Sequence, residues 1–505
     1  MTETDVDRDR SGEAPEFRNS WLEGPFAPVD QEVTVHDLKV TGTIPGELDG
    51  RLLRVGPNPV DPENPVTYNW FTGNGMVHGV RIRDGKAEWY RNRFVRDDQV
   101  AASRGLPPLP GPRQLGGGAR YVDANVVNTH IFPHAGKTWA FAEAGVLPIE
   151  LSYELESLAK CDFGGSLNGS WTGHPHQDPR TGELHGMTYY HGWEHVSYQV
   201  LGTDGKVRRT VDVPVAGRPV VHDMALTERY AIFLDGPVAY SDELLSQGYA
   251  FPFMWGFEYP TRWVLVPRDG VPGDVVSCEL EQWAVFHILG AYDLPDGRVA
   301  LIGPSNNRLF VTDRTGPGET PGKLNLYVID PAAGTTEVRT LDDRPQEMPR
   351  LDDRLVGSKY RYGYFSSRDN GMSTLIKQDF DAAASESYAY GPGRFGMEAV
   401  FVPRTPDSTE DDGWLMTYVT DMRTRTSEVV ILHAQDLAAG PVATIHIPYR
   451  VPIGFHGNWI PDSQLEEQRK VAAHAGLPRS AGASSVMTPS AQYCRTGSRF
   501  TPETN

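Results

Sequence analysis

The stretch VHGVRIRDGKAEWYRNRFV, residues 77–95, carries the local pattern that decides the fold class. Apolar and polar residues alternate on both sides of Asp84-Gly85, and a period of two is typical of half-buried strands. Asp-Gly is a preferred centre for a two-residue type I′ turn, because both positions of that turn need a positive φ. The stretch therefore predicts a β-hairpin that turns at residues 84–85.

The same scheme recurs along the chain. Strand, turn, strand patterns lie at 201–213 around Asp204-Gly205, at 291–303 around Asp296-Gly297, at 323–341 and at 414–435. The 52 Gly and 40 Pro fit many short strands joined by turns. Helical periodicity is limited to residues 465–476 and 241–249. Because the hairpins do not alternate with helices, the pattern predicts an all-β fold.

Many hairpins in a chain of 505 residues leave many strand edges to protect. Four-stranded sheets repeated radially around a channel solve this problem economically. We therefore expect a β-propeller, in which the N-terminal ends of inner strands from different blades meet at one axis. The hairpins show no strict repeat period and no Trp-Asp or kelch signature, so this expectation rests on strand number and on site geometry.

Composition excludes several functional classes. The net charge of −19 and the pI of about 5.2 argue against nucleic acid as a partner. The three cysteines are odd in number, widely spaced and without a CxxC pattern, which argues against a disulfide scaffold and a zinc-thiolate site and favours a reducing cytoplasm. They are Cys161, Cys278 and Cys494.

The two ends of the chain differ in composition from the middle. Residues 1–15 are charged and lack an apolar run, so they predict a disordered segment rather than a secretory signal. Residues 476–505 are rich in Ser, Gly, Thr and Pro and predict a flexible tail. Residues 16–475 show no obvious linker and are interpreted as one domain. The sequence contains no apolar stretch of 18 residues, so it predicts no membrane span.

Four of the fifteen histidines stand in compact, distinctive strings. They are His174 in TGHPH (172–176), His222 in VHDM (221–224), His287 in FHILGAYD (286–293) and His456 in GFHGNW (454–459). Four neutral imidazoles suit a divalent transition metal such as Fe, Cu, Ni or Zn better than Ca or Mg. The strings are too scattered for one helix or hairpin, so they predict a metal site only if the fold gathers distant segments. We interpret the nearby His176, His185, His191 and His195 as solvated or structural.

Taken in order, these strings resemble the carotenoid cleavage oxygenases. That family includes bacterial and plant carotenoid dioxygenases, lignostilbene dioxygenases and the retinoid isomerase of the retinal pigment epithelium. The resemblance extends from about residue 31 to residue 461. The segments that carry it are GRLLRVGPNPV (50–60), WFTGNGMVHGVRIRDGKAEWYRNRFVRD (70–97), HPHQDPRTGEL (174–184), VHDMALTERYAIFLDGPV (221–238), FHILGAYD (286–293), EDDGWLM (410–416) and VPIGFHGNWIP (451–461).

The resemblance implies a seven-bladed β-propeller with a helical and loop dome over a central metal site, so that residues 16–475 form one propeller oxygenase domain. It selects iron, one Fe(2+) per subunit, with O₂ as co-substrate. Matched motif by motif, the implied iron ligands are His174, His222, His287 and His456. Three glutamates would orient ligating imidazoles through the distal N–H, namely Glu143 for His222, Glu347 for His287 and Glu398 for His456.

Further residues match or depart from the family pattern. Thr129 matches a position where members place a small side chain beside an open iron site, and its methyl would restrict what binds there. Thr72 and Asn74 replace common acidic residues, and Gly290 replaces an Asn. Ala142 stands where lignostilbene cleavers carry the Lys that grips a phenol, which favours carotenoid substrates over stilbenes.

The implied function is a non-haem Fe(II) dioxygenase that cleaves a C=C bond of a carotenoid or apocarotenoid into two carbonyl products. Alternatives are a stilbene-cleaving dioxygenase, a retinoid-type isomerase or hydrolase on the same fold, and a non-catalytic binding propeller. The partner is a hydrophobic small molecule rather than nucleic acid. The apolar segment 251–259 is open to three interpretations: substrate tunnel, peripheral membrane contact or core. The expected location is the cytoplasm, while peripheral attachment to a membrane and the oligomeric state stay open.

Overall fold

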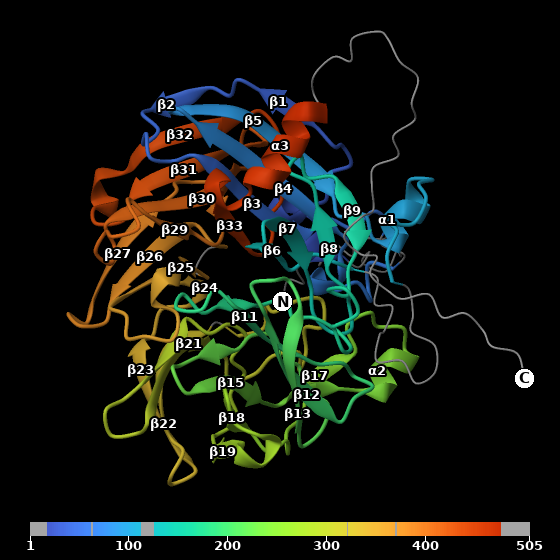
Figure 1. Ribbon diagram of the computed structural model, residues 1–505, viewed down its shortest axis with the longest axis vertical. Helices are drawn as coiled ribbons and strands as arrows, with labels where there is room; N and C mark the ends of the chain where they lie inside the picture. The colour runs from blue at the N-terminus through green and yellow to red at the C-terminus, as the bar shows by residue number, and fades with distance from the viewer. Residues whose placement is uncertain (1–17, 62–63, 113–125, 321, 369–370, 476–505) are drawn as a thin grey trace, which may run out of the picture.

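The computed structural model describes residues 18–61, 64–112, 126–320, 322–368 and 371–475. In these residues the chain forms seven sheets of four or more strands, arranged around a centre as the blades of a β-propeller (Figure 1). The predicted all-β, seven-bladed fold is confirmed. The predicted disordered segment 1–15 and flexible tail 476–505 lie outside the described residues.

The blades follow one another in chain order, and the strands within each blade pair in the following order. Blade 1 contains β33 (Gly457–Pro461), β3 (Gly50–Pro57), β4 (Gly75–Arg83), β5 (Lys86–Phe94) and β1 (Thr34–His36). Blade 2 contains β6 (His130–His134), β7 (Lys137–Phe141), β8 (Ile149–Leu151) and β9 (Ser157–Lys160). Blade 3 contains β10 (His176–Gln177), β11 (Leu184–Thr188), β12 (His195–Leu201) and β13 (Val207–Pro214).

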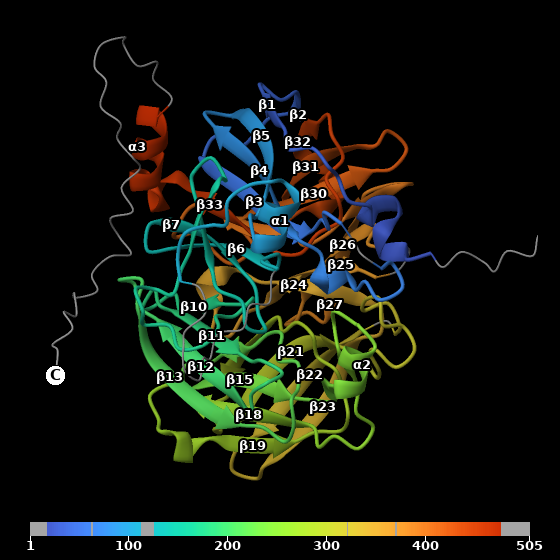
Figure 2. The same ribbon diagram turned by 90° about the vertical axis from the view of Figure 1, so that its right-hand side faces the viewer.

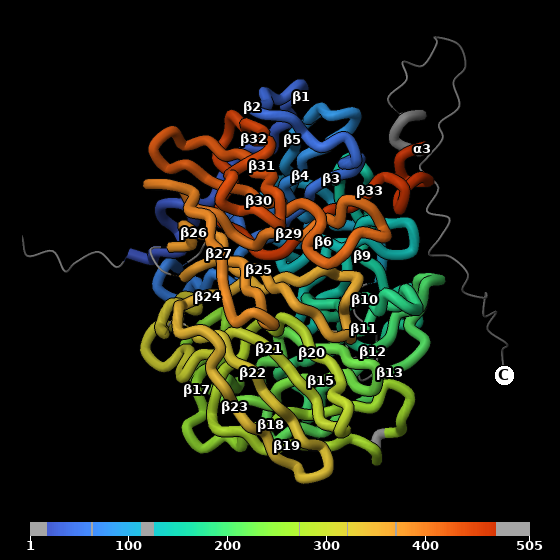
Figure 3. Tube along the Cα trace, turned by 90° about the vertical axis from the view of Figure 1, so that its left-hand side faces the viewer, coloured from blue at the N-terminus to red at the C-terminus, as the bar shows by residue number. Residues whose placement is uncertain are grey.

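The remaining blades complete the ring, as Figure 3 shows from the left-hand side of the view in Figure 1. Blade 4 contains β14 (Ala225–Leu226), β15 (Tyr230–Asp235), β18 (Arg262–Pro267) and β19 (Val276–Glu279). Blade 5 contains β20 (Gly290–Asp293), β21 (Val299–Ser305), β22 (Lys323–Asp330) and β23 (Thr335–Asp342). Blade 6 contains β24 (Gln346–Arg350), β25 (Tyr362–Ser367), β26 (Thr374–Asp379) and β27 (Ala384–Ala389). In blade 7, β28 (Arg394–Gly396) and β29 (Val400–Pro403) both pair with β30 (Gly413–Asp421), followed by β31 (Thr426–His433), β32 (Pro441–Ile447) and β2 (Val40–Gly42).

Outside the blades, β16 (Val238–Tyr240) and β17 (Phe253–Trp255) form a short ribbon. The α-helices are α1 (Asp98–Ser103), α2 (Asp242–Ser246) and α3 (Glu466–Ala475), and the last two lie within the ranges predicted to be helical. The 3₁₀ helices are η1 (Ser20–Leu22), η2 (Gly24–Phe26), η3 (Trp70–Thr72), η4 (Pro272–Asp274), η5 (Asp353–Leu355), η6 (Leu437–Ala439) and η7 (Asp462–Gln464). Among the described residues, no helix has the length and apolar character needed to cross a bilayer.

The hairpin at residues 77–95 forms as predicted. β4 and β5 pair up to Arg83 and Lys86, and Asp84 and Gly85 between them both have positive φ, as a type I′ turn requires. At Asp204-Gly205 the loop is longer than a two-residue turn, because the pairing stops at Leu201 and Val207. The dipeptide therefore located the turn but did not fix its length there.

The ring is closed by strands from both ends of the chain. The N-terminal β2 adds to β32 at the edge of blade 7, and the C-terminal β33 adds to β3 in blade 1. Behind this closure the buried carboxylate of Asp462 accepts hydrogen bonds from Arg81 at 2.7 Å and from Tyr153 at 2.9 Å. α3 lies at the rim next to β33 (Figure 2), so the two chain ends hold blades 7, 1 and 2 together.

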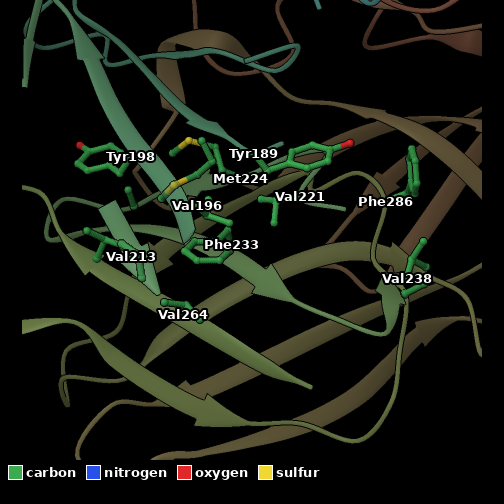
Figure 4. Packing of buried hydrophobic residues seen from close by; sticks show 14 of the residues in the cluster. Tyr189, Val196, Tyr198, Val213, Val221, Met224, Phe233, Val238, Val264 and Phe286 are labelled. Atoms are coloured by element: carbon green, nitrogen blue, oxygen red, sulfur yellow. The ribbon is translucent and has the colours of Figure 1, made fainter. Parts of the chain in front are cut away.

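Each pair of neighbouring blades buries its own apolar cluster, because the facing sides of both sheets are covered in β-branched, aromatic and aliphatic residues. Figure 4 shows part of the cluster between blades 3 and 4, where Val196, Val213 and Phe233 pack together. This cluster continues toward the centre through Tyr189 and Phe286. The packing of the blades thus extends without interruption to the wall of the central site.

Candidate metal centre

Each of the four singled-out histidines lies just before the first strand of a blade. His174 precedes β10, His222 precedes β14, His287 precedes β20 and His456 precedes β33. One ligand nitrogen of each lies within 4.8 Å of the others, and the four residues are buried or half-buried. The propeller therefore gathers segments that are up to 282 positions apart, counted from 174 to 456, at one point.

The four imidazoles meet through their Nε2 atoms. Nε2 of His222 lies 2.9 Å from that of His174 and 3.1 Å from that of His287, and His287 Nε2 lies 3.2 Å from that of His456. An ion held at about 2.1 Å by each nitrogen would place nitrogens at right angles about 3.0 Å apart. The donor set and its spacing therefore fit a divalent transition metal.

Carboxylates fix the opposite ring nitrogen in three of the four cases. His287 Nδ1 donates to Glu347 Oε2 at 2.7 Å, and His456 Nδ1 donates to Glu398 Oε1 at 2.9 Å. Glu143 Oε2 lies 2.7 Å from Nδ1 of His222, although the contact lacks the alignment of a hydrogen bond. With the proton on Nδ1, Nε2 of His287 and of His456 presents a lone pair to the centre, an arrangement that a divalent cation fits.

His174 differs, since the nearest carboxylate oxygen, on Asp223, is 4.0 Å from its Nδ1. Asp223 instead accepts hydrogen bonds from His176 Nε2 at 2.9 Å and from the backbone N–H of Ile288 at 2.8 Å. It therefore ties the loop that carries His222 to the loop that carries His287. The structural interpretation of His176 holds, and its partner is this buried Asp.

Burial and neighbouring charges shift the pKa values of the residues at the centre. Burial holds the pKa of His174 well below its ordinary range, and the neighbouring imidazoles act in the same direction. Burial also lowers the pKa of His287, but the carboxylates of Glu347, Asp223 and Glu398 together outweigh burial and the net pKa is raised. Burial would raise the pKa of Glu398, yet Arg350 and His456 hold it far below its usual range. The centre therefore combines imidazoles with ionised carboxylates.

A polar network supports the centre from behind. Arg350 donates from Nη1 to the carbonyl of Gly457 at 3.0 Å and from Nη2 to Asn458 Oδ1 at 2.9 Å, and its Nη1 lies 3.3 Å from Glu398 Oε1. Asn458 Nδ2 in turn lies 3.1 Å from Nε2 of the buried His130. One guanidinium thus connects strands or loops of blades 6, 7 and 1. These residues line a cavity of about 290 Å³.

A larger cavity of about 780 Å³ includes His222, His287 and His456 in its wall. Much of that wall is aromatic. Phe71, from η3, stacks on Phe286 with ring centroids 5.1 Å apart, and Phe286 packs on His222 at 4.2 Å. Other rings that line it are Phe251, Phe253 and Phe455. A large apolar cavity beside a polar centre is the usual form of a small-molecule site.

Similarity to known proteins extends over almost the whole propeller. The family described as Retinal pigment epithelial membrane protein matches residues 26–461. A protein of Mycobacterium tuberculosis named carotenoid cleavage oxygenase is 40% identical over 507 residues, covering 89% of this chain and 99% of the relative. This chain belongs to that family, the carotenoid cleavage oxygenases. The resemblance stated from the motifs is confirmed, and so is the expectation of an oxygenase enzyme.

Solved structures of carotenoid cleavage oxygenases have the same fold. The lignostilbene dioxygenase of Pseudomonas brassicacearum has a TM-score of 0.80 and 28% identity, covering 89% of this chain and 100% of that one. The cobalt-substituted apocarotenoid oxygenase of Synechocystis has a TM-score of 0.75 and 27% identity, covering 88% of this chain and 98% of that one. The coverage shows that the match includes all seven blades.

Departures from the family pattern fall at packed positions. Asn74 is buried and donates to Asp97 Oδ2 at 3.1 Å, whereas Thr72 donates to the carbonyl of Asn69 at 2.8 Å. A Cβ at Gly290 would approach the end of the Leu351 side chain to 2.8 Å, so a larger residue would require Leu351 to shift. These residues stabilise loops and strands around the site.

Two further predicted features lie at the large cavity. Thr129 is buried in its wall, and its methyl packs against Gly173, next to His174. Within the segment 251–259, Phe251 and Phe253 line the same cavity, Trp255 is buried and Phe257 is 60% exposed. The segment is therefore mostly cavity wall and core, with one exposed aromatic ring.

Motif reasoning missed several residues of the site. Phe286 and Phe455 each precede one of the four central histidines, and Phe71 lies in the WFTGNGM motif, so their sequence neighbours could have indicated them. Arg350 lies three residues after Glu347 on β24, a spacing that by itself predicts nothing about a contact with blade 1. Its role depends on the neighbouring blades.

Proposed function

We propose that this protein is a non-haem Fe(II) dioxygenase that uses O₂ to cleave a C=C bond of a carotenoid or apocarotenoid and releases two carbonyl products. The observation that carries the proposal is the convergence of four Nε2 atoms at the wall of a 780 Å³ aromatic cavity. The ligands would be His174, His222, His287 and His456, with Glu143, Glu347 and Glu398 beside Nδ1 of the last three.

Ferrous iron supplies the one-electron chemistry that triplet O₂ needs and that amino-acid side chains lack. The chain supplies positioning. Phe71 and Phe286 form a stacked wall next to His222, on which an extended polyene would lie with one double bond beside the centre. The buried rings exclude water from that region. The Thr129 methyl would narrow the space near His174 and so restrict which gas or water molecule binds there.

One relative and one residue favour a carotenoid substrate, whereas one solved structure supports a stilbene. The Mycobacterium tuberculosis relative is named for carotenoid cleavage, and Ala142 in the cavity wall offers no cation to a phenol. The structural similarity to a lignostilbene dioxygenase supports the stilbene alternative. A retinoid-type isomerase or hydrolase would need the same centre but no O₂.

The test is a substrate panel. Protein reconstituted anaerobically with Fe(II) would be exposed to ¹⁸O₂ together with carotenoids, apocarotenals or hydroxystilbenes, and the products identified by mass. We expect two labelled carbonyl products from a polyene and one O₂ consumed per bond cleaved. Cleavage restricted to hydroxystilbenes would replace the substrate assignment, and isomerised product without O₂ uptake would overturn the dioxygenase.

We also propose that the hydrophobic substrate reaches the cavity from a membrane surface by peripheral contact. Phe257 and Leu245 are exposed, and Leu245 also lines the cavity, so at least one exposed apolar side chain lies at the cavity itself. The net charge of −19 argues against attraction to anionic lipid. Flotation with neutral phosphatidylcholine vesicles should carry the protein, and Phe257→Ser should weaken this; an unchanged distribution would contradict the contact.

A further inference from the structure

One cationic side chain lines the large cavity and has no assigned role. Among the described residues of the cavity wall, Arg368 is the only Lys or Arg. It follows β25 and is partly buried, and its Nη2 donates to the carbonyl of Pro317 at 2.8 Å. We propose that Arg368 binds an oxygen of the substrate, and that this protein therefore selects polyenes with a carbonyl or carboxylate end, the apocarotenals and apocarotenoic acids, over hydrocarbon carotenes.

Most hydrogen-bond donors of Arg368 have no acceptor from the protein. A guanidinium has five N–H groups, and the donors that a bound substrate would shield from water need acceptors. In the described part of the chain, the carbonyl of Pro317 is the one acceptor of this side chain, and no carboxylate lies within 4.0 Å of it. The two glutamates of the cavity wall are engaged elsewhere, since Glu347 pairs with His287 and Glu143 with His222 and Tyr189.

The charge of Arg368 and its position near Glu347 restrict which ligands it can bind. Arg368 and Glu347 line the same cavity, and the pairing of Gln346 with Ser367 brings their two segments side by side. Burial lowers the pKa of Arg368, while the charge of Glu347 partly offsets this effect. Arginine stays cationic at neutral pH in spite of such shifts. Because Glu347 touches His287, an oxygen bound at Arg368 would lie on the same side of the cavity as the metal centre.

Because the surrounding wall is aromatic, the guanidinium of Arg368 would distinguish substrates with an oxygen at one end from pure hydrocarbons. A pure hydrocarbon bound along Phe71 and Phe286 would displace water from Arg368 without replacing its hydrogen bonds. A carbonyl accepts one such bond and a carboxylate accepts two in the fork geometry of guanidinium. Sites built around a buried polar group discriminate strongly against analogues that leave the group unpaired.

This inference rests on the proposed function for its substrate class, but its first test needs no turnover. Metal-free wild-type protein and Arg368→Met would be titrated with a polyene aldehyde, the matching acid and a hydrocarbon of equal length, with quenching of protein fluorescence as the readout. We expect wild-type protein to bind acid and aldehyde more tightly than hydrocarbon. In Arg368→Met, the binding affinity for acid and aldehyde should fall roughly 10- to 100-fold, and the affinity for the hydrocarbon should change little. Equal wild-type affinity for all three end groups would overturn the proposal.

Two further variants separate recognition from folding. Arg423→Met removes an exposed cation that pairs with Asp421, and it should leave all three affinities unchanged. Arg368→Lys should keep part of the preference for the acid, because it retains the charge without the fork. In Fe(II)-loaded enzyme, the Arg368→Met defect should appear in KM for oxygenated substrates rather than in kcat. Absence of cleavage by wild-type enzyme would refute the proposed function, whereas equal losses for all end groups would refute the role of Arg368.

Discussion

Two groups of buried histidines in this protein have opposite surroundings. The central four turn Nε2 toward one another, and three of them have a glutamate at Nδ1. In the described part of the chain, the other buried histidines have partners other than carboxylates. His185 contacts the hydroxyl of Tyr198 at 2.7 Å and Nη2 of Arg268 at 3.3 Å, and His78 contacts the hydroxyl of Tyr90 at 3.0 Å. Burial is common to both groups, so burial does not identify a metal ligand.

What separates the groups is the direction of the lone pairs. A neutral histidine beside a tyrosine exchanges one hydrogen bond and leaves no unmet demand for charge. Four Nε2 atoms about 3 Å apart, with carboxylates behind them, leave a demand that a divalent cation meets. Variants of the central histidines, of their supporting residues and of the other buried histidines can therefore test this difference. Their effects on metal binding should differ in size.

The largest effect is expected from His222→Ala or His287→Ala. Each removes one of the four nitrogen donors and the imidazole that its glutamate faces, so we expect iron to be lost on desalting and activity to fall to background. Iron content by atomic absorption and O₂ uptake measure both. His185→Asn is the matched control, which should retain a full complement of iron; normal turnover in either alanine variant would contradict the ligand assignment.

A smaller effect is expected at the glutamates. Glu398→Gln keeps the shape of the side chain but removes the charge behind His456, and we expect metal affinity or activity to fall about 10- to 100-fold. Folding should persist because the amide can still contact the Gly457 N–H. Affinity is measured by competition with a chelator, with Co(II) as a spectroscopic probe. Unchanged affinity together with unchanged kinetics would remove the role of Glu398.

Arg350 tests whether the support behind the histidines matters. Arg350→Met breaks contacts with Glu398, Asn458 and the carbonyl of Gly457, and breaking a buried ion pair costs about 3 kcal/mol or more. We expect a lower free energy of unfolding and roughly tenfold weaker metal binding. Arg350→Lys should recover part of the stability and less of the metal affinity, because ammonium lacks the planar fork. Equal metal affinity in all three proteins would show that Arg350 only stabilises the fold.

The sequence predicted the local pieces of this molecule better than their long-range supports. The hairpin around Asp84-Gly85 and the helix at 465–476 form where their patterns place them, since turn chemistry and helical periodicity act over a few residues. The number of blades came from family resemblance, because no repeat in the sequence counts them. The histidine strings were recognisable because each is compact.

The parts that escaped prediction depend on contacts between blades. His176 was interpreted as structural, but nothing in its string shows that Asp223, from the next blade, is its partner. Nor does the sequence around Arg350 show that it reaches Asn458 at the start of blade 1. Such pairs join positions 47 and 108 residues apart, and the registration of whole sheets against each other decides them.

The smallest effect on the metal centre, and a clear one on stability, is expected at His185. Burial lowers the pKa of His185 to about 3, against an ordinary value of 6.5 in the unfolded chain. The unfolded state therefore binds one more proton between these values, and the free energy of unfolding falls as pH drops from about 6.5 toward 3, by up to about 1.4 kcal/mol per unit. In His185→Asn this proton is absent, so urea unfolding followed from pH 7 to pH 4 should give a shallower dependence than in wild-type protein. Parallel slopes would mean that His185 is protonated in the folded state, and its contrast with the metal-facing histidines would disappear.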